Sequence, residues 1–343
     1  MSVFHSYLIQ YINIGCFSKA DYVSSLINSS KIFRRNAPKA IRLYQEMSIK
    51  KTESINRVES KIELKAYEGN NKYVLEMMFR LESELKTALL GAYVHGSLAT
   101  NEEIAYSDFD ALVILKDAVF ENEEILLNTA SKLYDLQQIM HEFDPLQHHG
   151  WFVMTESMLQ DYPSLYYPIE LFQHTRSLLK DQGLNLSVQI KETTEQEFQT
   201  PFYQLSNGIL NKLEKGYRAK NSFELKSLLS EFMLLPALYM QAKSQMGVYK
   251  KDSFPLAGKD FEKEDWKIMS DVSAIRDEWN YQLSSMQKHL LCSKNYTIRK
   301  IGRKYAPKIL SSISNQLTTD FFERMAYLTQ QMQSKLKEQN QIN

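Results

Sequence analysis

Two aspartates separated by one phenylalanine interrupt an apolar part of the chain. In "GAYVHGSLATNEEIAYSDFDALVIL", residues 91 to 115, Asp108 and Asp110 come directly before an apolar run. Side chains two positions apart on a strand project to the same face, so the two carboxylates would lie side by side while Phe109 enters the core. Adjacent anions repel unless a cation lies between them, and oxygen ligands of this kind suit Mg²⁺ or Mn²⁺. Asp108 and Asp110 are therefore predicted metal ligands, although a strand-start cap and an exposed sheet position would explain them structurally.

A glycine and a serine precede these acids by ten residues. Gly96 follows an apolar strand and permits close approach of the backbone to another group. Ser97 would present a hydroxyl and an N–H at the start of a helix, which is an arrangement that binds phosphate. We therefore expect Gly96 and Ser97 to bind a phosphate group next to the predicted metal.

Together, Gly96-Ser97, ten intervening residues and Asp108-Phe109-Asp110-Ala111 resemble the signature of the nucleotidyltransferase superfamily with the polymerase-β-like fold. In layout the chain is most similar to the aminoglycoside and other small-molecule nucleotidyltransferases. The resemblance implies transfer of a nucleoside monophosphate from an NTP, expected to be ATP, to a hydroxyl or similar acceptor, with release of pyrophosphate. It also implies a two-metal site of Mg²⁺ or Mn²⁺ on Asp108 and Asp110.

The chain departs from this family in the strand after the crossover helix, where a third carboxylate is usual. That segment reads "QHHGWFVM" and contains no acid. His148 or His149 could replace the acid, because a neutral imidazole can accept a hydroxyl proton or bind a metal. Glu142 and Asp144, just before it, are alternatives. The missing acid also leaves a second hypothesis open, namely a non-catalytic nucleotide-binding or interaction module on the same fold.

The segment "GVYKKDSF", residues 247 to 254, resembles part of the second wall of the nucleotide site in this family. Lys250, Lys251 and Ser253 are the residues that would reach the triphosphate. A lysine ammonium is a point charge well suited to phosphate. A solvated loop is the structural alternative for both lysines.

Helices should dominate the fold, because apolar residues recur at three-and-four spacing and the chain has only 11 glycines and 8 prolines. We expect strands at 89 to 95, 109 to 115 and 148 to 155. Helices are expected within 1 to 50 and 56 to 90, with strong amphipathicity over 72 to 88, and at 121 to 140, 221 to 247 with a kink at Pro236, 262 to 292 and 311 to 339. This order predicts an α+β fold with a small mixed β-sheet.

Three parts are predicted along the chain: an N-terminal helical extension (1 to 71), the nucleotidyltransferase core (72 to 190) and a C-terminal helical domain (191 to 343). The boundary between the last two is placed in "VQIKETTEQEF", residues 188 to 198, which is polar and carries no strand signal. By the resemblance, the helical domain closes the nucleotide cleft from the other side.

Composition limits the partners. Lys+Arg and Asp+Glu both number 41, so no overall charge attracts the protein to nucleic acid or to an anionic membrane. The two cysteines, Cys16 and Cys292, suit a reducing compartment. The N-terminus has no basic leader, and no apolar run reaches the roughly 20 residues of a membrane span. We expect a cytoplasmic protein.

The acceptor is not named by the sequence. The helical C-terminal part and the absence of a strongly basic surface favour a small molecule or a protein. RNA stays open, because basic runs occur at 31 to 42 and 298 to 308. The preferred nucleotide base and the oligomeric state are also left open.

Overall fold

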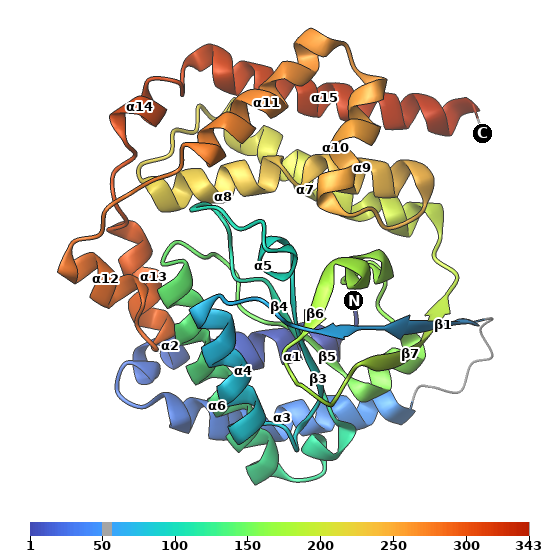
Figure 1. Ribbon diagram of the computed structural model, residues 1–343, viewed down its shortest axis with the longest axis vertical. Coiled ribbons are helices and arrows are strands. Elements are labelled where there is room, and N and C mark those ends of the chain that lie inside the picture. Colours follow the sequence, from blue (N-terminus) through green and yellow to red (C-terminus); the bar gives the residue numbers. More distant parts are fainter. Residues whose placement is uncertain (50–56, 343) are drawn as a thin grey trace.

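A small mixed sheet lies at the centre of the molecule (Figure 1). The computed structural model describes residues 1–49 and 57–342. The five strands follow the order β2-β6-β3-β4-β5 and comprise Lys65–Ala66, Thr175–Ser177, Leu89–His95, Ala111–Leu115 and Phe152–Thr155. Strand β3 is antiparallel to β4 and β6, whereas the outer pairs β4/β5 and β2/β6 are parallel. The predicted α+β class with a small mixed sheet is confirmed.

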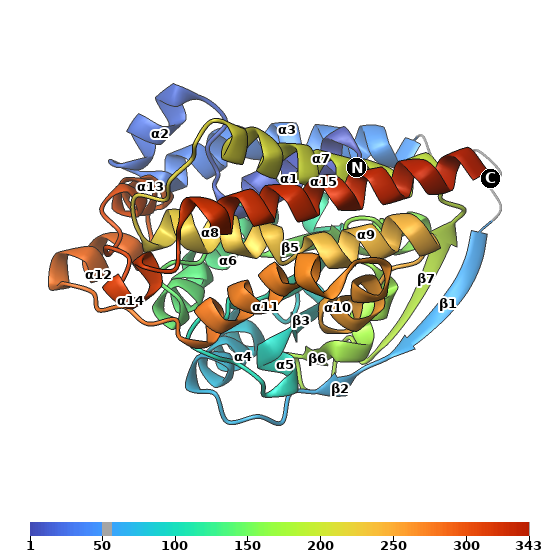
Figure 2. The same ribbon diagram turned by 90° about the horizontal axis from the view of Figure 1, so that it is seen from above.

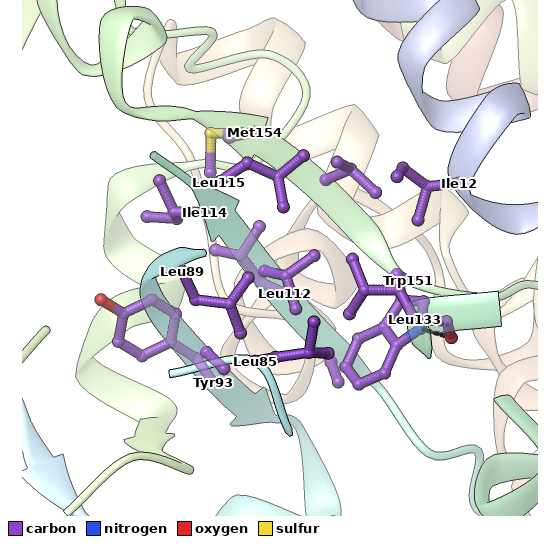
Figure 3. Close-up of a cluster of buried hydrophobic side chains, with 14 of the residues drawn as sticks. Ile12, Leu85, Leu89, Tyr93, Leu112, Ile114, Leu115, Leu133, Trp151 and Met154 are labelled. Atoms are coloured by element: carbon purple, nitrogen blue, oxygen red, sulfur yellow. Dashed lines mark hydrogen bonds between the residues drawn. The ribbon is translucent and has the colours of Figure 1, made fainter. Parts of the chain in front are cut away.

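The two central strands are buried and support the segments that follow β3 and precede β4. Tyr93 and Leu112 pair across the two strands, and both side chains are fully buried (Figure 3). Trp151, just before β5, donates from Nε1 to the carbonyl oxygen of Leu133, 2.8 Å away. Each buried side chain of this size contributes about 1.5–3 kcal/mol, so these strand ends are held firmly.

Helices of the N-terminal half pack against this sheet and against one another. They are α1 (Val3–Asn13), α2 (Lys19–Ser25), α3 (Ser29–Ile49), α4 (Lys72–Glu84) and α6 (Glu123–Phe143). Helix α6 contacts α1, α3 and α4, and α1 also contacts the edge strand β5. The helices expected at 72 to 88 and 121 to 140 are confirmed to within a few residues. The N-terminal helices share one continuous hydrophobic core with the sheet.

A two-stranded ribbon corrects two sequence predictions. Strand β1 (Arg57–Glu63) pairs antiparallel with β7 (Asn185–Lys191). Residues 57–63 and 65–66 are therefore strands, where a helix was expected. Residues 188–191 belong to a strand, where none was expected. Residues 50–56 lie outside the described part of the chain. Strand β1 is charged and largely exposed, whereas β7 alternates the buried Leu186 and Val188 with exposed polar residues, a period-two signal that the prediction missed. Each is defined by a partner far away in the sequence, as in the pairing of Arg57 with Lys191.

The C-terminal half is helical and has its own hydrophobic core. Its helices are α7 (Glu195–Glu214), α8 (Ser222–Phe232), α9 (Leu235–Ser244), α10 (Lys250–Ala257), α11 (Lys263–Asp277), α12 (Ser285–Leu291), α13 (Tyr296–Lys304), α14 (Ser311–Ser314) and α15 (Thr319–Ile342). Figure 1 and Figure 2 show α7 to α11 and α15 over one side of the sheet, whereas α12 and α13 lie at the edge of the molecule beside α2. Short elements complete the chain: helix α5 (Ser97–Thr100) and the 3₁₀ turns Asp117–Phe120, Glu156–Asp161, Ile169–His174 and Gly258–Asp260.

Three of the long helices expected here are divided. The segment 221 to 247 forms α8 and α9, and Pro236 lies in the first turn of α9, where its missing N–H costs no hydrogen bond. The prediction of one kinked helix was therefore wrong, although the Asn221 side chain does accept from the Glu224 N–H at the start of α8. The segments 262 to 292 and 311 to 339 are divided in the same manner. No helix in the described ranges is long and apolar enough to cross a membrane.

Candidate active site

A glycine turn connects β3 to the first predicted phosphate-binding residues. Gly96 has φ +70°, a left-handed value that favours glycine. A Cβ at this position would lie 3.1 Å from Asp110 Oδ2, so the turn brings the backbone against that carboxylate. Ser97 starts the short helix α5, and its hydroxyl donates to Ser107 Oγ at 2.9 Å. Gly96 and Ser97 therefore lie beside the segment that carries the aspartates.

The two aspartates immediately precede β4 instead of lying within it. The His95 N–H donates to the Asp110 carbonyl oxygen at 3.0 Å, which continues the pairing of β3 with the extended segment. Phe109 is fully buried, whereas the side chains of Asp108 and Asp110 retain 14% and 28% of their exposure. The expected alternation, with both acids on one side and Phe109 in the core, is present.

Gln147 joins the aspartate segment to the histidine segment. Its side-chain oxygen accepts from the Phe109 N–H at 2.8 Å, and its amide nitrogen donates to the Phe109 and His149 carbonyl oxygens. A side chain thus supplies the hydrogen bonds that a strand would have made. For this reason the strand expected at 148 to 155 begins only at Phe152. The role of Gln147 was not predicted from the sequence.

His149 is held as a cation beside Asp110. Its Nδ1 lies 3.1 Å from the Gly150 carbonyl oxygen, and its Nε2 lies 2.9 Å from Asp110 Oδ1. Both neighbours are acceptors, so the ring donates to both only as imidazolium. Burial alone would lower the pKa of His149, but the hydrogen bond to Asp110 and the charges of both aspartates raise it to about 9.

His148, in contrast to His149, is an uncharged imidazole at neutral pH. Its Nδ1 lies 3.9 Å from Asp108 Oδ2 and has no hydrogen-bond partner in the described part of the chain. Burial lowers the pKa of His148 to about 4, against the opposing charge of Asp108. At neutral pH His148 is therefore neutral and His149 charged. Adjacent groups whose pKa values are pushed apart in this way are typical of acid–base sites.

A buried lysine from the C-terminal helices enters the site. Lys226 Nζ lies 2.9 Å from Asp108 Oδ1 and 2.6 Å from Asp144 Oδ2, and its side chain is 1% exposed. Burial would raise the pKa of Asp108, but the charges of Lys226, His149 and His148 lower it instead. Asp144, between an ammonium and a carboxylate, has its pKa raised to about 7 by burial and by Asp108, although Lys226 opposes the shift.

Asp144 brings a third carboxylate into the site from the end of α6. It was one of two acids considered as substitutes for the missing family acid. The other, Glu142, accepts a hydrogen bond from Gln138 on the same helix and makes no contact with the aspartates that the structure records. Lys226 was not predicted. A signal was present, because Lys226 is three residues before the buried Leu229 and so lies on the apolar face of α8.

The residues of the site fit a divalent cation. Ligand atoms of Asp108, His148 and His149 lie within 4.8 Å of one another. His148 Nδ1 is a buried nitrogen with no hydrogen-bond partner among the described residues, and its lone pair can hold a metal or accept a proton, but not both at once. A set of carboxylate and imidazole donors suits Mn²⁺ at least as well as Mg²⁺. His149 would join such a set only after releasing its proton.

The three predicted residues of α10 are placed differently from one another. Burial lowers the pKa of Lys250 to about 8, and the negative charges of Asp110 and Asp108 oppose this shift. Lys251 is exposed and forms an ion pair with Glu102 at 2.5 Å. Ser253 is fully buried, and its hydroxyl donates to the Lys250 carbonyl oxygen at 2.6 Å. Of the three, Lys250 alone interacts electrostatically with the aspartates.

Part of the chain is similar to a known protein family. Residues 80–142 match the family model described as "Nucleotidyltransferase domain". This segment contains Gly96, Ser97, Asp108 and Asp110, and it confirms the resemblance to the nucleotidyltransferase superfamily drawn from the motif. No curated protein matches the chain.

A solved structure of spectinomycin adenyltransferase AAD(9) from Enterococcus faecialis with ATP and spectinomycin is similar to the chain at 9% sequence identity and a TM-score of 0.38. The similarity covers 69% of this chain and 99% of the adenyltransferase. At this TM-score the similarity carries no argument about mechanism or acceptor. The assignment of these residues to a nucleotidyltransferase site rests on the motif, on the matching family model and on the geometry of the site.

Proposed function

We propose that the protein is a metal-dependent nucleotidyltransferase that moves a nucleoside monophosphate from an NTP, most simply ATP, to a hydroxyl acceptor and releases pyrophosphate. The observation that carries this proposal is the meeting of the Gly96 turn, Asp108 and Asp110 within a segment that matches the nucleotidyltransferase model. The two histidines at the same place provide groups for proton transfer.

The phosphates would be bound by Ser97 and Lys250. The Ser97 hydroxyl and N–H lie at the start of α5, next to the aspartates. The Lys250 ammonium is close enough to both aspartates for its pKa to respond to them. Phosphate would give this partly desolvated ammonium a partner of opposite charge. We do not extend the role to Lys251 and Ser253, because their polar groups already have partners within the protein.

Asp108 and Asp110 are the proposed metal ligands. A bound Mg²⁺ or Mn²⁺ would neutralise charge on the transferred phosphoryl group. Lys226 already places one positive charge between Asp108 and Asp144. We therefore propose a site in which one cation position is filled by the protein itself and one by a divalent ion, in place of the two metal ions that the family resemblance implies.

His148 is the proposed general base. It is neutral at neutral pH, and its Nδ1 has no other partner among the described residues. A hydroxyl proton could therefore move to this nitrogen. His149 has a different role, since its charge and its hydrogen bond orient the Asp110 carboxylate. A general base contributes about 10²–10⁴-fold to the rate.

A transfer screen tests the proposal. The purified protein is incubated with each α-labelled NTP, with Mg²⁺ or Mn²⁺, and with small-molecule, protein and RNA fractions of a lysate. We expect label to move to one acceptor class, with pyrophosphate released, and no transfer in EDTA. Tight binding of NTP and metal without transfer to any fraction would favour the non-catalytic module. That second function has one observation in its favour: Lys226 and His149 already offset much of the negative charge of the site.

A cytoplasmic location remains part of the proposal. Cys16 and Cys292 are both free and buried. Free thiols are the usual state in a reducing compartment.

A further inference from the structure

A pocket of about 390 Å³ opens beside the two histidines, and Lys226 is not among its lining residues. Its walls come from α1, α6, the segment before β5, and α13, and they include His148 and His149 themselves. The pocket is therefore continuous with the candidate active site. A larger cavity of about 950 Å³ lies elsewhere, between α1, α3 and α7, and none of the predicted site residues lines it.

Two arginines and a buried histidine line the pocket. Arg299 and Arg303 come from α13, and His141 comes from α6. No aspartate or glutamate lines it, and neither arginine forms an ion pair with a carboxylate in the described part of the chain. Arg299 is 2% exposed and His141 3%, and Arg299 Nε and His141 Nδ1 both lack a hydrogen-bond partner there.

The guanidinium groups of the two arginines differ in their contacts. Arg299 donates to the carbonyl oxygens of Ser293 and Lys294, both at 2.7 Å, and so shapes the turn before α13. Arg303 is held by aromatic faces instead, with its guanidinium 4.9 Å from the centre of the Phe223 ring and 5.7 Å from that of Tyr296. Arg303 also forms a hydrogen bond with Tyr296, and the remaining N–H groups of its guanidinium are the donors that a ligand would use.

Arg299 is buried and Arg303 partly exposed, and carbonyl oxygens and aromatic faces replace only part of the solvation that these cations lose, so a bound anion would stabilise them. Burial lowers the pKa of Arg299 to about 10 and lowers that of Arg303 as well, yet both stay protonated at neutral pH. A buried cation without a counter-ion loses solvation that an opposite charge restores. A guanidinium has the planar geometry that binds carboxylate or phosphate through two hydrogen bonds.

We propose that this pocket binds the acceptor, and that the acceptor carries a carboxylate or a phosphate held by Arg303, with its hydroxyl directed at His148. The inference rests on the proposed function. The volume suits a small molecule, since ligand pockets span about 300–1,000 Å³. The positive lining disfavours polycationic acceptors such as aminoglycosides.

In the proposed transfer, one bond to the α-phosphorus forms and another breaks. The acceptor hydroxyl oxygen bonds to the α-phosphorus of the NTP, and the bond from that phosphorus to the bridging oxygen of the β-phosphate breaks. The hydroxyl proton goes to His148 Nδ1, and pyrophosphate leaves. The product is a phosphodiester of the anionic acceptor, which still carries its carboxylate or phosphate.

A binding experiment tests the pocket without depending on turnover. Inorganic phosphate and, separately, acetate are titrated by calorimetry into the wild type, Arg303→Gln, Arg303→Lys and Lys304→Gln. Lys304 is exposed on the same helix and does not line the pocket, so its variant controls for loss of one charge. We expect Arg303→Gln to weaken binding about tenfold or more, the scale of a lost charge-assisted hydrogen bond, and Arg303→Lys to fall between. Equal affinity of all four proteins would overturn the proposal.

A transfer experiment then separates the pocket from the reaction. The acceptors are hydroxy acids, sugar phosphates, their neutral parent sugars and aminoglycosides, and the first two classes distinguish carboxylate from phosphate. We expect transfer to one anionic class, with a raised KM for that acceptor in Arg303→Gln and an unchanged KM for ATP. Anion binding without transfer to any compound would leave the pocket standing and contradict the proposed function. Transfer only to neutral or cationic acceptors would contradict the pocket and support the function.

Discussion

Replacing Lys226 by methionine removes the only positive charge that α8 contributes to the aspartates. The ammonium lies 2.9 Å from Asp108 and 2.6 Å from Asp144, and the side chain is 1% exposed. Water therefore cannot take its place without opening the contact between the C-terminal helices and the sheet. Removing one partner of a buried ion pair typically costs about 3–5 kcal/mol of unfolding free energy.

The loss should depend on pH, and its sign follows from Asp144. Burial and Asp108 already raise the pKa of this carboxyl to about 7, far above its value in an unfolded chain, and loss of Lys226 raises it further. A carboxyl with a raised pKa in the folded state binds a proton that the unfolded state has released, so stability falls as pH rises. We therefore expect the full cost above neutral pH and a smaller cost in mildly acidic solution.

Urea unfolding followed by circular dichroism, at about pH 6 and pH 8 in EDTA, measures this effect. Lys212→Met is the matched control, because Lys212 pairs with Glu231 on the same group of helices but is 39% exposed. Its loss should be within about 1 kcal/mol. The double variant Lys226→Met/Asp144→Asn should recover much of the stability. If Lys226→Met lost no more than Lys212→Met at pH 8, the ion pair would not hold the two halves together.

Two further predictions concern the motif and the histidines. Gly96→Ala should lower the unfolding free energy by about 1–2 kcal/mol, because the backbone is left-handed at this position, and should also reduce NTP affinity. The control is Gly208→Ala, on a helix with open space at the Cβ position, which should be neutral or stabilising. Equal Tm values for the two variants would refute the tight turn. His148→Ala should lower turnover by about 10²–10⁴-fold, while the exposed His289→Ala leaves it unchanged. The loss of activity assigned to His148 should come only near its pKa of about 4, so a fall centred near 6.5 that persists in Asp144→Asn, where the carboxyl with a pKa of about 7 is removed, would contradict His148 as the base.

The sequence predicted the parts of the site that depend on short spacing. Asp108 and Asp110 share a face because of the two-residue period of extended backbone, and Gly96 is placed by the strand that ends before it. The histidines were expected there by the family resemblance, because they occupy the strand on which related enzymes usually carry a third carboxylate. Local patterns of this kind are present in the residues themselves.

What the sequence did not reveal depends on long-range contacts. Gln147 holds Phe109 from 38 positions away, and Lys226 meets Asp144 across 82 positions. Neither distance is readable from periodicity, although a lysine on the buried face of α8 was a usable signal. The pairing of β1 with β7 was not predicted either: β1 is charged and largely exposed, and the alternation of Leu186 and Val188 in β7 does not reveal a partner so far away in the sequence.

The assignment of Asp110 as a metal ligand is the central claim, and one substitution tests it most directly. Asp110→Asn removes a charge with little change in shape. Glu102→Gln is the control, since Glu102 is an exposed acid of the same segment that pairs with Lys251. Metal-dependent pyrophosphate release from ATP is measured with the acceptor that the transfer screen identifies, for the wild type and both variants, together with their Tm. We predict that Asp110→Asn stays folded and releases none, while Glu102→Gln matches the wild type. Release by Asp110→Asn at the wild-type rate would contradict the assignment of the site.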